Sequence, residues 1–333
     1  MNIQKKRFRA LFYCKNNLIY FEIVMKYVIV YPGQGSQSVG MLSDLSANFS
    51  IVKDIFSEAS DAINVDLWKL AQEDENSLNQ TENTQPAMLA AGYATYKVLA
   101  NEINLSPALM AGHSLGEYTA LVAVGSLEFF DAARLVRKRA QLMQTAVPTG
   151  TGAMAAILGL DDEQVIEICN QCSSSGIVEA VNFNSPGQVV IAGEKGTINI
   201  ACEAMKNAGA KRTLVLPVSV PSHCSLMTDA AQEFSYYVDA VNFKIGNISV
   251  LHNVDASIAE DINEIKSKLV EQLYKPVLWT SSVQKMQQLG IEKLVELGPG
   301  KVLAGLTRRV DRSLSASAVI DMVTLQSTIE EIA

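Results

Sequence analysis

Histidine is scarce in this chain of 333 residues, which contains only His113, His223 and His252. A reaction that needs an imidazole base therefore has few candidates. The five cysteines lack the paired spacing of a disulfide framework or of a metal knuckle. Cys169 and Cys172 form a lone C-x-x-C late in a helical pattern, where buried thiols are a simpler interpretation than redox or metal chemistry. This cysteine usage fits the reducing cytoplasm.

Basic charge is also in deficit, because 27 Lys and Arg face 35 Asp and Glu, for a net charge of -8. Without a basic excess the chain is no general nucleic-acid binder. Long apolar runs are missing too. Residues 1–24 are basic and then only patchily apolar, a poor signal peptide and too broken to span a membrane. We expect 1–24 to be a dispensable extension or an upstream start, with an amphipathic anchor as the alternative.

Apolar residues, by contrast, make up 48% of the chain, enough for a large core. Strand and helix patterns alternate from residue 27 onward, which predicts a mostly parallel sheet covered by helices. The expected segments before residue 149 are strand 27–31, helices 50–63 and 84–102, strand 107–111 and helix 128–146. Those after residue 218 are helix 224–241, strand 248–252, helix 262–274 and strand 293–297.

Residues 149–218 have a different order of elements. Strand, helix, two strands, helix and strand follow one another there, which is the βαββαβ order of a ferredoxin-like unit. We therefore predict a core with a mostly parallel sheet, formed by 25–148 and 219–333. The ferredoxin-like subdomain is inserted between these two parts.

Ser114 lies in the stretch AGHSLGEYTA, between an expected strand and an expected helix. A serine in so sharp a turn needs small neighbours, and Gly112 and Gly116 flank it. The free N–H groups at the start of the following helix suit a developing oxyanion. The motif indicates a nucleophile elbow. A glycine-rich turn without chemistry stays open as the alternative.

Arg139 occupies the buried stripe of helix 128–146, because its neighbours three and four residues away are all apolar. An arginine keeps its charge and needs an anion when it is buried. That anion is either a carboxylate of the protein or the carboxylate of a ligand.

A base for Ser114 must come from His223 or His252, since His113 points the wrong way as its immediate neighbour. His223 lies at the junction between the inserted subdomain and the core, where it could act as base and then as acid. It could also simply belong to a helix start at Pro221 and Ser222. We expect His252 to be structural.

Seven motifs occur in an order that resembles one family, the malonyl-CoA:acyl carrier protein transacylases of dissociated bacterial fatty acid synthesis. The resemblance runs from about residue 25 to about residue 315. It implies an α/β-hydrolase-like core with a parallel sheet and an inserted ferredoxin-like subdomain. The motifs are YPGQGSQ (31–37), TQPA (84–87), GHSLGEY (112–118), VNFNSPGQVVIAG (181–193), VSVPSHC (218–224), QLYKPVLW (272–279) and ELGPGKVLAGL (296–306).

The resemblance implies a ping-pong transfer of malonyl from malonyl-CoA to the phosphopantetheine thiol of holo acyl carrier protein. Ser114 is then the acylated nucleophile and His223 its base. The backbone carbonyl of Asn253 is expected to orient the imidazole, and the backbone N–H groups of Gln34 and Leu115 to form the oxyanion hole.

The same resemblance implies that Arg139 binds the malonyl carboxylate and that Gln272 lies near the acyl pocket. Gln272 has mixed helical neighbours and could instead be exposed at a boundary. No metal and no bound cofactor are expected, and the protein is expected to be a cytoplasmic monomer. Lys211 with Arg212, and Lys301 with Arg308 and Arg309, are candidate docking patches for an acidic carrier protein; ordinary solvated charges are the alternative.

Three other functions remain open. A serine hydrolase would use the same elbow with water as the acceptor, although Arg139 has no obvious use in a simple esterase. A non-catalytic module that binds a carrier protein would need to have lost Ser114, His223 or Arg139. An acyltransferase for another acyl group, such as methylmalonyl, is weakly distinguished by sequence.

Overall fold

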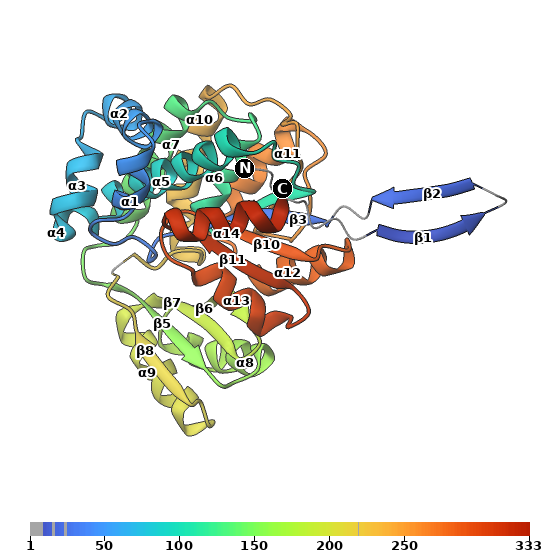
Figure 1. The fold of residues 1–333 in the computed structure, drawn as a ribbon. Coiled ribbons are helices and arrows are strands. Elements are labelled where there is room, and N and C mark those ends of the chain that lie inside the picture. The colour runs from blue at the N-terminus through green and yellow to red at the C-terminus, as the bar shows by residue number, and fades with distance from the viewer. Residues whose placement is uncertain (1–8, 15–16, 23–24, 219) are drawn as a thin grey trace.

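The computed structural model describes residues 9–14, 17–22, 25–218 and 220–333. Its largest part is built on a parallel sheet of five strands in the order β11-β10-β3-β4-β9 (Figure 1). The strands are β3 (Tyr27–Tyr31), β4 (Leu109–Gly112), β9 (Val250–Leu251), β10 (Lys293–Leu297) and β11 (Ser315–Val319).

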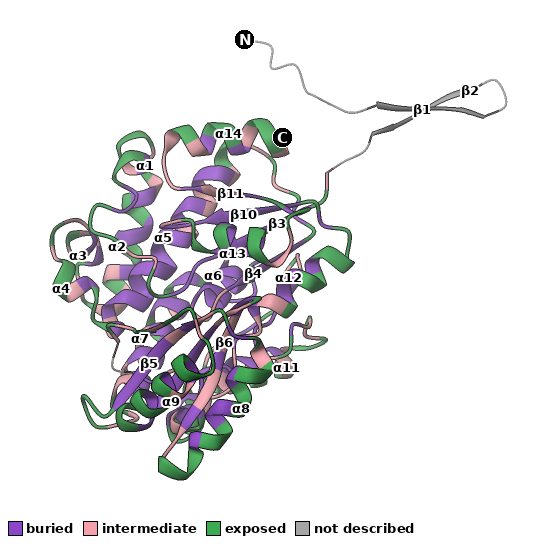
Figure 2. Ribbon diagram, turned by 90° about the horizontal axis from the view of Figure 1, so that it is seen from below, coloured by how far each residue is buried: buried purple, intermediate pink, exposed green. Residues whose placement is uncertain are grey.

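The central strand β3 is buried along its whole length, because helices cover both faces of the sheet (Figure 2). Tyr27, Ile29 and Tyr31 point to one face and belong to the larger apolar cluster. Val28 and Val30 alternate with them and belong to a second cluster on the other face. A strand with two buried faces reads as the continuous apolar run YVIVY.

Most helices of the core pack on the face of the sheet to which Ile29 points, and α12 and α13 pack on the opposite face. The helices of the first group are α1 (Ser43–Asn48), α2 (Ile51–Ile63), α3 (Leu67–Glu73), α4 (Glu75–Leu78), α5 (Thr81–Glu102), α6 (Gly116–Ala123), α7 (Phe129–Thr145), α10 (Thr228–Ala240), α11 (Ile262–Glu271) and α14 (Met322–Ile332). Those of the second group are α12 (Trp279–Gln288) and α13 (Val302–Val310).

An antiparallel sheet of four strands, in the order β6-β7-β5-β8, forms the inserted subdomain below the core in Figure 1. The chain order is βαββαβ, so the structure confirms the expected fold class. The elements are β5 (Gly152–Leu158), α8 (Asp162–Cys172), β6 (Val178–Ser185), β7 (Gln188–Glu194), α9 (Lys195–Asn207) and β8 (Arg212–Val215).

The two cysteines of the C-x-x-C sequence are buried free thiols within the apolar core of the inserted subdomain. Burial raises the pKa of Cys169 to about 12. A thiol held in its protonated form is a poor nucleophile and a poor metal ligand. The geometry therefore favours a packing role for this pair.

Helix α5 begins at Thr81, three residues before the expected start at Thr84. The Thr84 hydroxyl donates to the carbonyls of Leu78 and Gln80, which supports the chain where α4 leads into α5. Pro86 therefore lies one turn inside the helix, where its missing N–H removes only one helical hydrogen bond.

The N-terminal segment contains β1 (Arg9–Cys14), which pairs antiparallel with β2 (Asn17–Glu22). Half of residues 1–24, namely 1–8, 15–16 and 23–24, lie outside those that the structure describes, so the expectation that 1–24 is dispensable stays a prediction. Of the helices in the described part of the chain, none is both long and apolar enough to cross a bilayer.

Candidate active site

Ser114 sits in a sharp turn between the end of β4 and the start of α6, with a positive φ of 50°. A Cβ at Gly112 would lie 1.9 Å from the carbonyl carbon of Gly116, and a Cβ at Gly116 would lie 2.0 Å from the backbone carbonyl oxygen of Tyr31. Only glycine fits at these two positions, because β4, α6 and the end of β3 are packed closely together there. The turn is the strained elbow that the sequence predicts.

The imidazole of His223 faces this serine. Its Nε2 lies 2.8 Å from Ser114 Oγ, and its Nδ1 lies 2.6 Å from the backbone carbonyl of Gln272. A carbonyl only accepts, so Nδ1 carries the proton and Nε2 is free to accept one from the serine. Burial, together with the nearby charge of Arg139, lowers the pKa of His223 to about 3, which keeps the imidazole neutral near pH 7.

The expectation that the Asn253 carbonyl orients this imidazole is wrong. That carbonyl accepts a hydrogen bond from the Leu278 N–H instead, at 2.9 Å. The orienting carbonyl belongs to Gln272, the residue that ends α11 and has a carbonyl free of the helical ladder. Asn253 holds the nucleophile turn: its Oδ1 accepts from the Ser114 N–H at 2.6 Å, and its Nδ2 donates to the Gly112 carbonyl at 2.6 Å.

Arg139 is 1% exposed, and its guanidinium points at the nucleophile. Nη2 donates to Ser114 Oγ at 3.2 Å and to Gln272 Oε1 at 2.9 Å, and Nη1 donates to Gln85 Oε1 at 2.9 Å. Its Nε is buried without a partner, and no carboxylate of the described residues forms an ion pair with it. Desolvation lowers the pKa of Arg139, and the nearby Tyr118 and Glu117 oppose that shift. This buried cation therefore lacks the protein carboxylate that was one of its two expected partners.

Gln34 and Leu115 line the same cavity as Ser114 and His223. Leu115 precedes the first residue of α6, and Gln34 follows the end of β3. Within the described residues, neither backbone N–H donates to another protein group. Both donors are therefore free to bind an oxygen atom of a ligand in this cavity.

The cavity above Ser114 has a volume of about 130 Å³ and lies between the core and the inserted subdomain. The inserted subdomain and the segment that follows it contribute the wall residues Met154, Asn182, Leu216 and Val218. A polar contact also joins the two parts, because His113 Nε2 lies 2.8 Å from Asn184 Oδ1 on β6. The subdomain covers the site with a mostly apolar wall.

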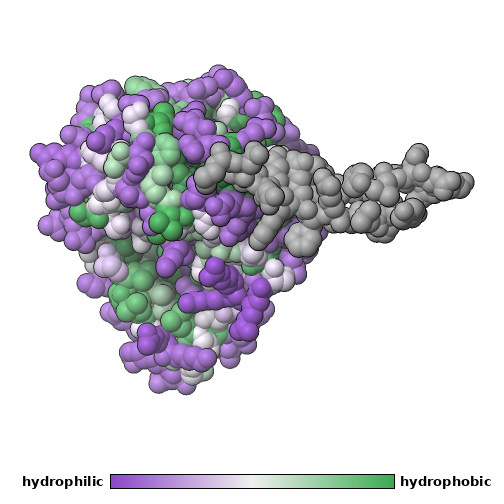
Figure 3. Space-filling view, in the orientation of Figure 1, coloured by the Kyte–Doolittle hydropathy of each residue, from purple (hydrophilic) through white to green (hydrophobic). Residues whose placement is uncertain are grey.

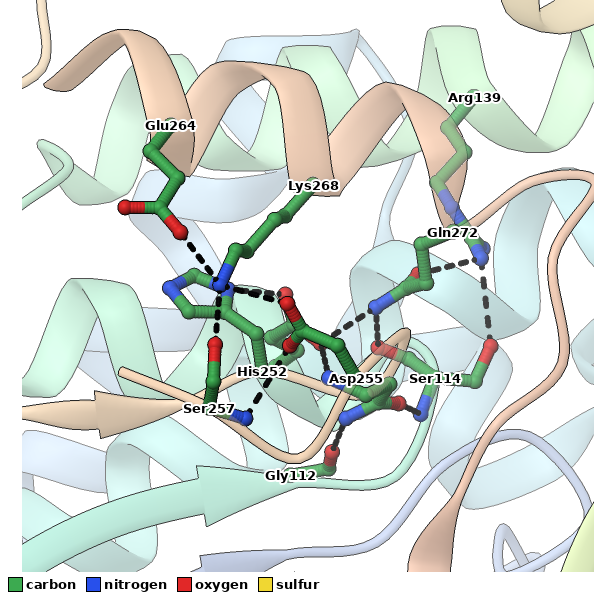
Figure 4. A network of polar contacts seen from close by, with 11 residues as sticks. Gly112, Ser114, Arg139, His252, Asp255, Ser257, Glu264, Lys268 and Gln272 are labelled. Atoms are coloured by element: carbon green, nitrogen blue, oxygen red, sulfur yellow. Dashed lines mark hydrogen bonds and ion pairs between the residues drawn. The ribbon is translucent and has the colours of Figure 1, made fainter. Parts of the chain in front are cut away.

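Two residues of the site carried no role in the sequence analysis, Gln85 and Glu117. Gln85 lies on α5 and contacts Arg139. Glu117 is fully buried on α6 and contacts His252, Asn253 and Gln272. Figure 4 shows His252 and Gln272 together with Ser114 and Arg139. A single carboxylate in the otherwise uncharged helix Gly116–Ala123 was the signal that could have indicated it.

Comparison with known proteins agrees with this geometry. A family model described as acyl transferase domain matches residues 28–323. The chain is 51% identical to the malonyl CoA-acyl carrier protein transacylase of Haemophilus influenzae over 307 residues, which cover 92% of this chain and 98% of that protein. It is 49% identical to the protein of the same name from Escherichia coli K12, over 92% of this chain and 99% of that one.

The chain also superposes closely on solved structures of malonyltransferases. An acyl carrier protein S-malonyltransferase from Vibrio cholerae O1 superposes with a TM-score of 0.89 at 50% identity, over 91% of this chain and 99% of that one. A malonyl-transacylase in complex with its type II polyketide acyl carrier protein superposes with a TM-score of 0.91 at 48% identity, over 92% and 99%. With the elbow, the base and the buried arginine in place, these matches establish that the chain belongs to the acyl transferase domain family.

Proposed function

We propose that this protein transfers a malonyl group from malonyl-CoA to the phosphopantetheine thiol of holo acyl carrier protein, through a malonyl ester on Ser114. The observation that carries the proposal is the arrangement at Ser114 Oγ. His223 Nε2 lies 2.8 Å from this oxygen, and the guanidinium of Arg139 lies 3.2 Å from it without a carboxylate partner. The names of the relatives described above specify the same two substrates, malonyl-CoA and acyl carrier protein.

In the first half-reaction Ser114 Oγ attacks the thioester carbonyl of malonyl-CoA while His223 Nε2 accepts its proton. The N–H groups of Gln34 and Leu115 stabilise the oxyanion, and Arg139 also donates to Oγ. When the C–S bond breaks, His223 returns the proton to the sulfur of CoA. The products are malonyl-Ser114 and CoA with a free thiol.

In the second half-reaction the phosphopantetheine thiol gives its proton to His223 and attacks the ester. Collapse of the intermediate breaks the bond to Ser114 Oγ, which takes the proton back. The imidazole keeps one orientation through both steps, because the Gln272 carbonyl holds Nδ1 throughout. No cofactor takes part in these steps.

Selection of a diacid follows from the position of Arg139. A malonyl group on Ser114 places its carboxylate a few bonds from the ester, within reach of the guanidinium. The carboxylate then supplies the anion that the buried cation lacks, through charge-assisted hydrogen bonds. An acetyl group has no carboxylate and forms no such hydrogen bond with Arg139, so malonyl binds more tightly than acetyl.

Carrier docking involves two exposed basic patches, one on the inserted subdomain and one at α13. Lys211 and Arg212 are exposed beside Leu214 and Val215, apolar residues of β8 that are 62% and 50% exposed. In Figure 3 hydrophobic side chains gather on the inserted subdomain, whereas most of the surrounding surface is hydrophilic. A partner with acidic and apolar residues on one face fits such a surface.

The second basic patch, on α13, is also exposed but partly engaged. Arg308 donates to the Ala316 carbonyl, and Arg309 donates to Gln188 of the inserted subdomain. Lys301 has no such contact among the described residues. We propose both patches as docking surfaces and a cytoplasmic monomer as the working form.

The experiment is intact-protein mass spectrometry after brief mixing with malonyl-CoA, followed by addition of holo carrier protein. We expect a malonyl adduct that exceeds the acetyl adduct formed from acetyl-CoA. Holo carrier should discharge it faster than water does. Ser114→Ala is the control and should form no adduct.

Other outcomes contradict the proposal in distinct ways. An adduct lost to water at the same rate with or without carrier indicates a hydrolase. A methylmalonyl adduct that forms faster than the malonyl adduct indicates a different acyl group. A malonyl adduct on Ser114→Ala would show that another residue is the nucleophile.

A further inference from the structure

Glu117 is a buried carboxylate that does not line the cavity above Ser114, yet it contacts several residues of the site. Its side chain is 1% exposed. Oε1 lies 2.8 Å from His252 Nδ1, and Oε2 accepts from the Asn253 N–H at 2.9 Å and from Gln272 Nε2 at 2.8 Å. A carboxylate deprived of water must be compensated by such donors.

The contact with Gln272 decides which way its side-chain amide points. Gln272 Nε2 lies between two groups that only accept, the Glu117 carboxylate and the Ser114 carbonyl at 3.2 Å. Its oxygen must therefore face the other side, where Arg139 Nη2 donates to it at 2.9 Å. If the amide turned over, its NH₂ group would face the N–H groups of the guanidinium, donor against donor.

Glu117 also supports the nucleophile turn through Asn253. The carboxylate holds the backbone N–H of Asn253, and the side chain of the same residue holds Ser114 N–H and the Gly112 carbonyl. One carboxylate thus fixes the serine turn and the Gln272–Arg139 pair relative to each other. The distance between Ser114 Oγ and Arg139 depends on that relation.

We propose that Glu117 is a positioning residue for the selection of a diacid. By holding Gln272 Nε2, it keeps the amide oxygen on Arg139 and keeps the guanidinium aimed at an acyl group on Ser114. This inference rests on the proposed malonyl transfer. Glu117 itself does not contact the reacting atoms.

The test compares acylation of Ser114 by malonyl-CoA and by acetyl-CoA in Glu117→Gln. The amide has one acceptor for the donors that a carboxylate served, so the Gln272 amide can turn over. We expect the malonyl-to-acetyl ratio of kcat/KM to fall about tenfold or more, the size of one lost charge-assisted hydrogen bond. The loss should appear mainly in the KM for malonyl-CoA. An unchanged ratio in a folded Glu117→Gln protein overturns the inference.

A double-mutant cycle with Gln272→Ala shows whether the effect passes through the amide. Alanine keeps the backbone carbonyl that orients His223 and removes only the side chain. Gln272→Ala should lower the ratio by itself, and Glu117→Gln should then lower it little further. If Glu117→Gln has its full effect in the Gln272→Ala background, or if Gln272→Ala keeps the wild-type ratio, the inference fails.

Glu296→Gln is the matched control for loss of a buried carboxylate. Glu296 is 0% exposed on β10 and accepts from the N–H groups of Leu303 and Ala304. Its amide variant should keep the malonyl-to-acetyl ratio even if stability falls. A ratio that falls as far in Glu296→Gln as in Glu117→Gln would mean that general loosening explains both.

Glu117→Asp serves if Glu117→Gln does not fold. It keeps the charge but withdraws the carboxylate by about 1.5 Å, too far to hold Gln272 Nε2. We expect a reduced ratio here as well, and a wild-type ratio overturns the inference. A wild-type protein that forms no malonyl-Ser114 at all refutes the proposed function, whereas an unchanged ratio in the variants refutes only the role of Glu117.

Discussion

The core and the inserted subdomain contribute to the same cavity in different ways. The core supplies the hydroxyl of Ser114, the imidazole of His223 and the guanidinium of Arg139 from separate segments of the chain. The inserted subdomain and the segment after it supply a largely apolar wall. Parallel strands joined by crossovers bring their carboxyl ends to one edge of the sheet, so a parallel core gathers distant residues there. The antiparallel unit takes all its strands from one continuous stretch of the chain, from β5 to β8.

The two regions also differ in what they bury. The core buries Glu117, Arg139, His252 and Gln272, each at 1% exposure or less. The interior of the inserted subdomain contains apolar side chains and thiols, and the polar side chains buried there, Asn184, Ser185 and Thr197, are neutral. Buried polar groups cost free energy unless they are paired, so their concentration in one region marks the site that needs them. We therefore expect substitutions in the core to change chemistry and those in the insert to change it much less.

The largest effect is expected from His223→Ala. Without the base, the Ser114 proton has no acceptor, and acylation by malonyl-CoA and acetyl-CoA should fall together by about a thousandfold. Single-turnover quenching with mass detection measures this rate. Leu216→Ala, in the wall of the cavity, is the comparison and should cost less than about tenfold. Equal losses in the two variants would break the division of roles between the regions.

Next in size is Arg139→Met, which should lower acylation by malonyl-CoA about a hundredfold and spare acetyl-CoA. A pH effect accompanies it. The Arg139 cation helps to depress the pKa of His223, so its removal raises that pKa and makes the imidazole protonate at higher pH. The acid limb of the acetyl-CoA profile should therefore move upward in pH. A limb that stays in place, or moves down, would show that Arg139 does not act on this base.

A smaller effect is expected at the contact between the regions. Asn184→Ala leaves the buried Nε2 of His113 without its partner on β6 and should lower the free energy of unfolding by about 1–3 kcal/mol. Urea denaturation measures it, and activity should change only a few-fold. Asn170→Ala, on the exposed side of α8, is the control and should be near neutral. If the two variants are equally stable, the contact does not hold the insert to the core.

The smallest effect is expected from Gly196→Ala in α9 of the insert. A Cβ there meets no atom within 4 Å, and alanine restricts the unfolded chain, so stability should rise by about 0.5 kcal/mol. The midpoint of urea denaturation should increase with activity unchanged. Gly116→Ala is the contrasting variant in the core, where a Cβ would lie 2.0 Å from the Tyr31 oxygen. Destabilisation by Gly196→Ala would mean that α9 packs more tightly than its contacts indicate.

Much of this arrangement could be predicted from local patterns. The apolar neighbours of Arg139 predict its burial, and the glycines around Ser114 predict the elbow; the structure confirms both. The expected strand 27–31 matches β3, and the order βαββαβ matches the insert. Such features depend on periodicity and backbone sterics within a few residues. α12, α13, α14 and β11 were not expected, although each is regular in the structure.

The features that escaped prediction depend on residues far apart in the chain. Gln272 has mixed helical neighbours but is 0% exposed, because the end of α11 packs against Arg139 of α7 and Glu117 of α6. The carbonyl that orients His223 was assigned to Asn253, since nothing local distinguishes one backbone carbonyl from another. Only tertiary packing decides which one meets the imidazole.

The sequence by itself determined the two sheets, the serine elbow, the base candidates and the buried cation, because each follows from local spacing or from the cost of burying a charge. Only the tertiary structure decided which groups are in contact. The Gln272 carbonyl contacts His223, the Asn253 side chain contacts Ser114, and Glu117 contacts both Gln272 and Asn253. Hydrogen bonds act over about 3 Å, and here they join residues 49 to 155 positions apart in the chain, which a local sequence pattern cannot indicate.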